Sequence, residues 1–216
     1  MRNFEGILFD IDGTLTSTNE LIFASFNHVA KKYLNKSYTP EELIALFGPP
    51  EDEILKELIG EKYDEAHYDY FDFYHRNHEA LADIYPGIKD ILSDIRKEGI
   101  PLGIFTGKGR KASTITLKVL NIYDYFDMIV TGDDVKKHKP NPEGILKFVE
   151  KYKLEKDKVV LIGDAPADIK AARGAGVKIA SVVWDSYAKT IVMESNSDYV
   201  FHTVEELHKF INKNIH

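Results

Sequence analysis

The stretch Gly6–Leu15, which reads Gly-Ile-Leu-Phe-Asp-Ile-Asp-Gly-Thr-Leu, constrains the fold of this chain more than any other. Its apolar run Ile7–Phe9 is typical of a buried strand, and two carboxylates, Asp10 and Asp12, come where that strand ends. Ligands of open α/β sheets bind outside the carboxyl ends of the strands, so we expect both acids to point into a site. Burying unpaired carboxylates is unfavourable, which indicates a hard divalent cation as their partner.

Further apolar runs alternate with amphipathic helical patterns along the rest of the chain. We expect the later strands at residues 100–105, 128–131, 159–162, 178–183 and 199–201. Between residues 17 and 82 only helical patterns occur, over a length far greater than a usual connection. The pattern therefore predicts an α/β fold, a Rossmann-like, mostly parallel sheet flanked by helices, with an inserted all-helical domain.

Composition limits the classes of partner. The chain has 216 residues and a net charge of −7, which argues against nucleic acid as a partner. It has no cysteine, so disulfides, thiolate catalysis and cysteine-based zinc sites are excluded. No apolar run approaches the ~18 residues of a membrane span and no signal-peptide pattern is present, so we expect a cytoplasmic protein without a membrane partner.

Polar side chains recur just after the predicted strands. Thr106 follows the second strand, Asp164 and Asp168 follow the fourth, and Lys139 lies between the third strand and its helix. Parallel strands would bring these ends together at one edge of the sheet. Acids for a metal, a hydroxyl and a lysine are what phosphoryl transfer needs. Taken singly, each residue has a simpler interpretation; for the two aspartates, for example, it is the capping of the following helix.

The motifs resemble those of one superfamily. Phe9–Leu15 resembles the first motif of the haloacid dehalogenase-like superfamily, most of whose members are phosphatases. Ile104–Gly107 resembles the second motif, Lys139-Pro140 the third and Gly163–Asp168 the fourth. The resemblance covers nearly the whole chain, with all four motifs in order.

The resemblance implies a catalytic role for each acid. Asp10 would be the nucleophile that forms an aspartyl-phosphate, and Asp12 would protonate the leaving oxygen and then activate water. Magnesium would be held by the Asp10 carboxylate, the Asp12 backbone carbonyl and Asp164. Asp168 would support the metal shell.

The resemblance also implies the groups that hold the phosphoryl oxygens. These are the Thr106 hydroxyl, the Gly107 N–H and Lys139. The helical insertion resembles the small cap of one subfamily, with residues 16–82 as the cap and residues 1–15 plus 83–216 as the catalytic core. Members most similar in their motifs are phosphoglycolate phosphatases and related pyrophosphatases, which implies a small phosphorylated metabolite as substrate and a monomer or homodimer.

The cap loop departs from part of the family. The β-phosphoglucomutase branch usually carries a basic residue there, but Pro49-Pro50-Glu51 has none, which weakens a mutase interpretation. A second anionic group of the substrate then lacks an obvious partner, although Lys31, Lys32 or Arg76 is expected to be within reach. The acidic run Glu51–Glu53 is interpreted as a solvated helix start.

A function of another class remains open at this point. Phospho-receiver signalling modules also place an aspartate, a threonine and a lysine at strand ends. Their acceptor acid follows a middle strand of the chain, and they carry no long insertion after the first strand. A receiver dephosphorylates once and slowly, whereas an enzyme turns over. Pyrophosphatase and mutase activities are the alternatives within the enzyme class.

Overall fold

The computed structural model describes residues 2–216 and is centred on a six-stranded sheet. Its strand order is β5-β4-β1-β6-β7-β8, and every neighbouring pair is parallel. The predicted Rossmann-like, mostly parallel sheet is therefore confirmed. The strands are β1 (Gly6–Phe9), β4 (Leu102–Phe105), β5 (Met128–Val130), β6 (Val159–Gly163), β7 (Lys178–Val182) and β8 (Tyr199–Phe201).

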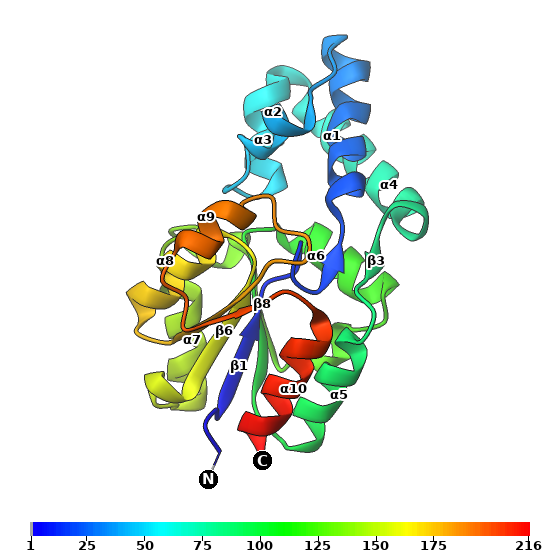
Figure 1. Ribbon diagram of the computed structural model, residues 1–216. Helices are drawn as coiled ribbons and strands as arrows, with labels where there is room; N and C mark the ends of the chain where they lie inside the picture. The colour runs from blue at the N-terminus through cyan, green and yellow to red at the C-terminus, as the bar shows by residue number, and fades with distance from the viewer. Residues whose placement is uncertain (1) are drawn as a thin grey trace.

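Separate layers of helices cover the two faces of the sheet, because successive side chains of a strand point to opposite faces. Along β1, Ile7 and Phe9 pack with the residues of α5, α6 and α10, whereas Leu8 packs with those of α7, α8 and α9. These helices are α5 (Ile88–Lys97), α6 (Arg110–Val119), α7 (Glu143–Tyr152), α8 (Pro166–Ala175), α9 (Lys189–Glu194) and α10 (Val204–Ile215). Both chain ends lie at the amino end of β1 (Figure 1).

The segment between β1 and the rest of the sheet is helical, as its pattern predicts, and we call it the helical insertion. It has a hydrophobic cluster of its own, which includes the fully buried Leu55, Tyr70 and Tyr74. It lies beyond the carboxyl end of β1, far from both termini (Figure 1). Its helices are α1 (Asn19–Leu34), α2 (Pro40–Ile44), α3 (Glu51–Ile59) and α4 (Tyr63–Leu81).

The helical insertion contains a capped short helix, and a two-stranded ribbon joins it to the sheet. Thr39 and Glu42 form a capping box at the start of α2. Thr16–Ser17 forms the short strand β2, which pairs antiparallel with β3 (Asp83–Ile84). The two crossings into and out of the helical insertion are therefore tied together by this ribbon.

Short 3-10 helices complete the chain: η1 (Gly60–Lys62), η2 (Tyr123–Tyr125), η3 (Gly132–Asp134) and η4 (Lys156–Lys158). Across residues 2–216, none of the helices combines the length and the apolar character that crossing a membrane requires.

Candidate active site

The site lies where the central strands end. β1 runs between β4 and β6, and its last residue is in register with residues near the ends of both neighbours. Asp10, Thr106 and Asp164 each come directly after one of these three strands. Parallel pairing therefore places their side chains at the same edge of the sheet.

A cavity of about 330 Å³ opens at this edge, between the sheet and the helical insertion. The structure brings to this one cavity every residue that the sequence analysis nominated for catalysis, metal binding or binding of the phosphoryl oxygens. The nominated residues that line it are Asp10, Asp12, Thr106, Gly107, Lys139, Asp164 and Asp168.

Three carboxylates and one lysine form the floor of the cavity, and we call Asp10, Asp164, Asp168 and Lys139 the acid cluster. One carboxylate oxygen from each of the three acids lies within 4.8 Å of the others. Lys139 Nζ lies 2.6 Å from Asp168 Oδ1 and 3.2 Å from Asp10 Oδ2. Asp168 also accepts a hydrogen bond from the Ala165 N–H at 3.1 Å. The acid cluster thus holds three potential negative charges against one positive charge.

Burial makes this imbalance unfavourable. It raises the pKa of Asp10 to about 6, with Lys139 opposing the shift, and it raises the pKa of Asp164 well above its ordinary value. Burial alone would lower the pKa of Lys139, but the charges of Asp10 and Asp168 outweigh it and raise that pKa. Buried carboxyl oxygens in this number suit a hard divalent cation, which neutralises them and accepts oxygen ligands. The donor set therefore fits magnesium.

Gly13 lets the chain turn tightly over Asp164. Its φ is +74°, a backbone conformation that residues other than glycine rarely adopt. A Cβ at this position would lie 2.5 Å from Asp164 Oδ2. Thr14, which follows, donates a hydrogen bond from its hydroxyl to Asp164 Oδ1 at 3.3 Å. The glycine of the first motif is thus required by the close approach of the acid at the end of β6.

Asp12 is turned away from the acid cluster. Its carboxylate accepts a hydrogen bond from the Thr18 hydroxyl, and both of its oxygens lie 3.2 Å from Lys108 Nζ. Thr18 directly precedes α1, so one partner of Asp12 comes from the entry to the helical insertion. The second acid of the motif therefore lies where the two parts of the molecule meet.

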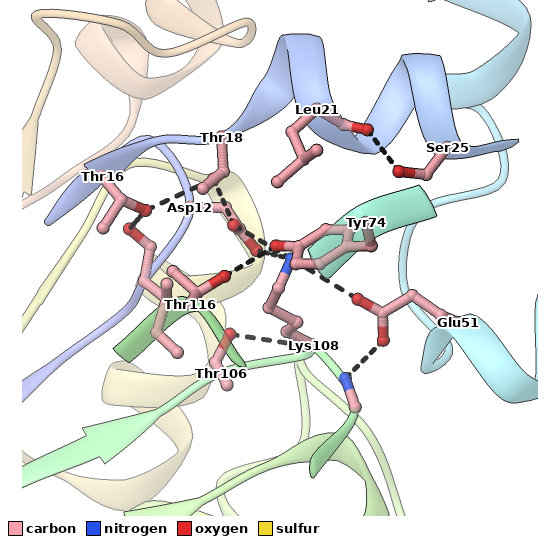
Figure 2. Close-up of polar contacts among 12 residues, drawn as sticks. Asp12, Thr16, Thr18, Leu21, Ser25, Glu51, Tyr74, Thr106, Lys108 and Thr116 are labelled. Atoms are coloured by element: carbon pink, nitrogen blue, oxygen red, sulfur yellow. Dashed lines mark hydrogen bonds and ion pairs between the residues drawn. The ribbon is translucent and has the colours of Figure 1, made fainter. Parts of the chain in front are cut away.

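The helical insertion contributes a carboxylate to the same group, as Figure 2 shows. Glu51, the first residue of α3, lies 3.4 Å from Lys108 Nζ through Oε1 and accepts the Gly109 N–H at 2.6 Å through Oε2. Its side chain is only 7% exposed, so the prediction of a solvated helix start is wrong at this residue. The prediction of a solvated side chain agrees with the structure at Glu53, whose side chain is 56% exposed. We call Asp12, Lys108 and Glu51 the Lys108 bridge.

Lys108 was not nominated from the sequence, although it lies two residues after the nominated Thr106. Its side chain is 1% exposed and lies over the Tyr74 ring, 5.1 Å from the centroid. Burial alone would lower its pKa, but the charges of Asp12 and Glu51 outweigh burial and hold the pKa well above the ordinary value. Burial also raises the pKa of Glu51, which Lys108 opposes. A lysine so soon after a buried strand end was the signal that could have identified it.

The cations expected to serve a second anionic group do not reach the cavity. Lys32 pairs with Asp69, and Arg76 pairs with Asp72 one helical turn away at 3.0 Å. Lys31 is exposed, and none of the three lines the cavity. Their charges are directed to the outer surface of the helical insertion, so that expectation is wrong.

Comparison with known proteins agrees with this geometry. The family model for haloacid dehalogenase-like hydrolases matches residues 7–182, which assigns the chain to the hydrolases. The chain therefore belongs to the haloacid dehalogenase-like hydrolase family. The pyrophosphatase PpaX of Anoxybacillus flavithermus is 33% identical over 205 residues, which cover 95% of each chain.

Solved structures show the same fold. A predicted phosphoglycolate phosphatase from Haemophilus somnus superposes with a TM-score of 0.87 at 21% identity, and the match covers 97% of this chain and 99% of that one. CbbY from Rhodobacter sphaeroides, solved in complex with phosphate, has a TM-score of 0.82 at 21% identity, over 94% and 96% of the two chains.

Proposed function

We propose that the protein is a magnesium-dependent phosphatase that hydrolyses phosphate monoesters of small metabolites through a phosphoryl group held transiently on Asp10. The observation that supports this most is the acid cluster, in which the buried Asp164 and Asp168 and the largely buried Asp10 converge beside Lys139. Catalysis of phosphoryl transfer consists mainly of positioning and charge stabilisation. A nucleophile, a cation site and a lysine on one cavity floor provide the parts for both.

The ligands of the metal would be the carboxylates of Asp10 and Asp164 and the backbone carbonyl of Asp12. When bound, the ion supplies positive charge to the phosphoryl oxygens and the nucleophile. Asp168 would support the metal site without binding the ion directly, because its carboxylate accepts hydrogen bonds from Lys139 and from the Ala165 N–H. It keeps Lys139 beside the nucleophile.

The residues of this chain divide the reaction between them. The Thr106 hydroxyl, the Gly107 N–H and Lys139 hold the phosphoryl oxygens. Asp10 attacks phosphorus through a carboxylate oxygen, the bond to the leaving oxygen breaks, and Asp12 donates a proton to that oxygen. Asp12 then takes a proton from water, whose oxygen attacks phosphorus and releases inorganic phosphate, which restores the Asp10 carboxylate.

We propose that residues 16–82, which contain the helical insertion, serve as the cap over a core of residues 1–15 and 83–216. The helical insertion supplies part of the cavity wall, including Ile22 and Glu51. Such a cover excludes bulk water from the phosphoenzyme and selects the leaving group.

Pyrophosphate hydrolysis is the second candidate, and the curated relatives named PpaX favour it. It would use the same nucleophile and metal, with inorganic phosphate as the leaving group. Mutase activity has no basic residue on the cap loop to support it. A phospho-receiver role is disfavoured, because the chain belongs to a family of hydrolases.

The experiment is to measure phosphate release from a panel of small phosphate esters with magnesium, and to trap the phosphoenzyme by acid quench and mass spectrometry. We expect turnover and a phosphoryl group on Asp10. Asp10→Asn should lower kcat by on the order of 10⁴-fold or more, as nucleophile removal does in other hydrolases. Asp157→Asn, on an exposed aspartate before β6, is the matched control. Undiminished turnover by Asp10→Asn would refute the assigned nucleophile.

A further inference from the structure

The wall of the cavity opposite the acid cluster is apolar. It comes from the helical insertion and the loop that follows α2, and its polar side chains among the described residues are Asn19 and Glu51. The leaving group of a phosphate ester whose phosphorus lies beside Asp10 would face this wall. Its apolar members are Ile22, Phe26, Ile44, Phe47, Pro49 and Ile54.

Aromatic rings continue this wall at the rim. Phe23 stacks on Phe47 with ring centroids 6.2 Å apart and contacts Tyr187 at 6.0 Å. Tyr187 follows β7, so the rim joins the helical insertion to the sheet side of the cavity. The leaving group therefore meets hydrocarbon on several sides.

Both cations of the cavity are already engaged. Among the described residues that line it, Lys108 and Lys139 are the only lysines or arginines. Lys139 is committed to the acid cluster, where it meets the phosphoryl group. Lys108 lies between Asp12 and Glu51, 3.2 Å and 3.4 Å from their carboxylates. No cationic side chain of the described lining is left for a second anion.

Glu51 cannot easily turn out of the cavity. Its Oε2 accepts the Gly109 N–H, and a Cβ at position 109 would lie only 2.7 Å from that oxygen, so glycine is what permits this approach. A buried charge held in place interacts strongly with a second charge, because little water screens it. A leaving group with a negative charge would meet this carboxylate, whose cationic partner Lys108 is already shared with Asp12.

We infer that the site selects phosphate monoesters whose leaving group is uncharged and partly apolar, and that Glu51 is the residue that excludes a second anion. This inference rests on the proposed phosphatase function and narrows its substrate class. It predicts that neither pyrophosphate nor phosphoglycolate is the preferred substrate, although relatives carry names with those activities.

A matched pair of substrates tests the inference on the wild-type enzyme. Ethyl phosphate and phosphoglycolate differ only in a methyl group against a carboxylate. We expect kcat/KM with magnesium to be at least tenfold higher for ethyl phosphate, higher again for n-butyl phosphate, and lower for pyrophosphate than for ethyl phosphate. If phosphoglycolate or pyrophosphate equals or exceeds ethyl phosphate, the inference is overturned while the phosphatase function stands. If no compound is hydrolysed, the proposed function itself fails, and the inference fails with it.

A charge-neutral variant tests the role of Glu51. Glu51→Gln keeps an acceptor for the Gly109 N–H, removes the buried negative charge and leaves Lys108 paired with Asp12 alone. The preference for ethyl phosphate over phosphoglycolate should therefore fall at least tenfold. Glu53→Gln, which removes an exposed charge from the same helix, should leave the ratio unchanged. An equal loss on both substrates by Glu51→Gln would assign Glu51 a purely structural role and overturn this part. The wild-type ratio decides the substrate class whether or not the variant folds.

Discussion

The acid cluster and the Lys108 bridge lie on two sides of one cavity, and they balance their charges differently. In the acid cluster, three carboxylates face one lysine. Asp10 and Asp164 directly follow strands, Lys139 lies in a loop and Asp168 lies in the first turn of α8. In the Lys108 bridge, one lysine lies between two carboxylates, of which Glu51 comes from the helical insertion.

This difference separates the site that we propose receives a cation from a contact that holds two parts of the molecule together. The acid cluster carries unfavourable charge that an added divalent ion relieves. In the Lys108 bridge, one lysine faces only two carboxylates, so less negative charge is left unbalanced. The bridge is complete only when the helical insertion packs against the sheet. Removing a charge should therefore have opposite effects on the stability of the metal-free fold in the two places.

After Asp10→Asn, the largest effect is expected at Asp164. Asp164→Asn should lower kcat/KM by on the order of 10³-fold, because the proposed metal ligand is lost. The variant should also lose the stabilisation by magnesium, which amounts to about 2.7 kcal/mol at a hundredfold excess over Kd. Burial holds the pKa of Asp164 well above normal, so ionisation at neutral pH opposes folding, and the metal-free variant should unfold at a higher temperature than wild type. Calorimetry in EDTA and in magnesium measures the metal-free Tm and the stabilisation by magnesium. A lower Tm for Asp164→Asn than for wild type in EDTA would contradict this account.

Asp12→Asn should have the next largest effect. Loss of the proton donor and base should reduce kcat by roughly 10²–10⁴-fold. Asn also keeps an acceptor for the Thr18 hydroxyl, so the fold should persist. With an activated aryl phosphate, whose leaving group needs little protonation, phosphoenzyme should accumulate in the acid-quench assay. Normal turnover without accumulation would show that another group moves the proton.

Lys108→Met tests the other side of the comparison. It leaves the buried Glu51 and the partly buried Asp12 without their cation. Removing one partner of a buried pair typically destabilises a protein by about 3–5 kcal/mol. Urea unfolding measures the loss. Adding Glu51→Gln should recover part of it, because one unpaired charge is then removed. Lys118→Met, at an exposed position on α6, is the control and should change the free energy of unfolding by about 0.5 kcal/mol or less.

The smallest effect is the dependence of stability on pH that arises from His78. This fully buried ring lies 3.1 Å from the Thr116 hydroxyl, and burial, helped by Lys108, lowers its pKa from 6.5 to about 4. Between pH 6.5 and about pH 4, the His78 side chain is protonated in the unfolded chain but neutral in the folded chain. The free energy of unfolding therefore decreases as the pH is lowered through this range.

The expected loss from His78 between pH 7.5 and pH 5 is about 2 kcal/mol. Urea unfolding of wild type and His78→Gln at both values isolates it, because other groups titrate equally in the two proteins. His202→Gln, at an exposed histidine, should retain the wild-type pH dependence. An unchanged slope in His78→Gln would show that His78 is protonated in the fold.

Much of the fold was predictable because its signals are local. The apolar runs and helical periods located the strands of the large sheet and the helices α1 and α3 to within a few residues. The short helix α9 and the β2–β3 ribbon were missed. A two-residue strand has no periodicity of its own, and it exists only because the chain leaves and re-enters the sheet at one place.

The sequence by itself determined the acid cluster, because each of its members belongs to a motif attached to a strand, and parallel pairing then joins the strand ends. Only the tertiary structure decided the environment of Glu51. Glu51 lies 57 positions before Lys108 in the chain, and its burial and its ion pair depend on how α3 packs against that lysine. No local sequence pattern specifies this packing. The charge of a side chain can be read from its residue type, whereas the burial that gives this charge its effect arises from packing.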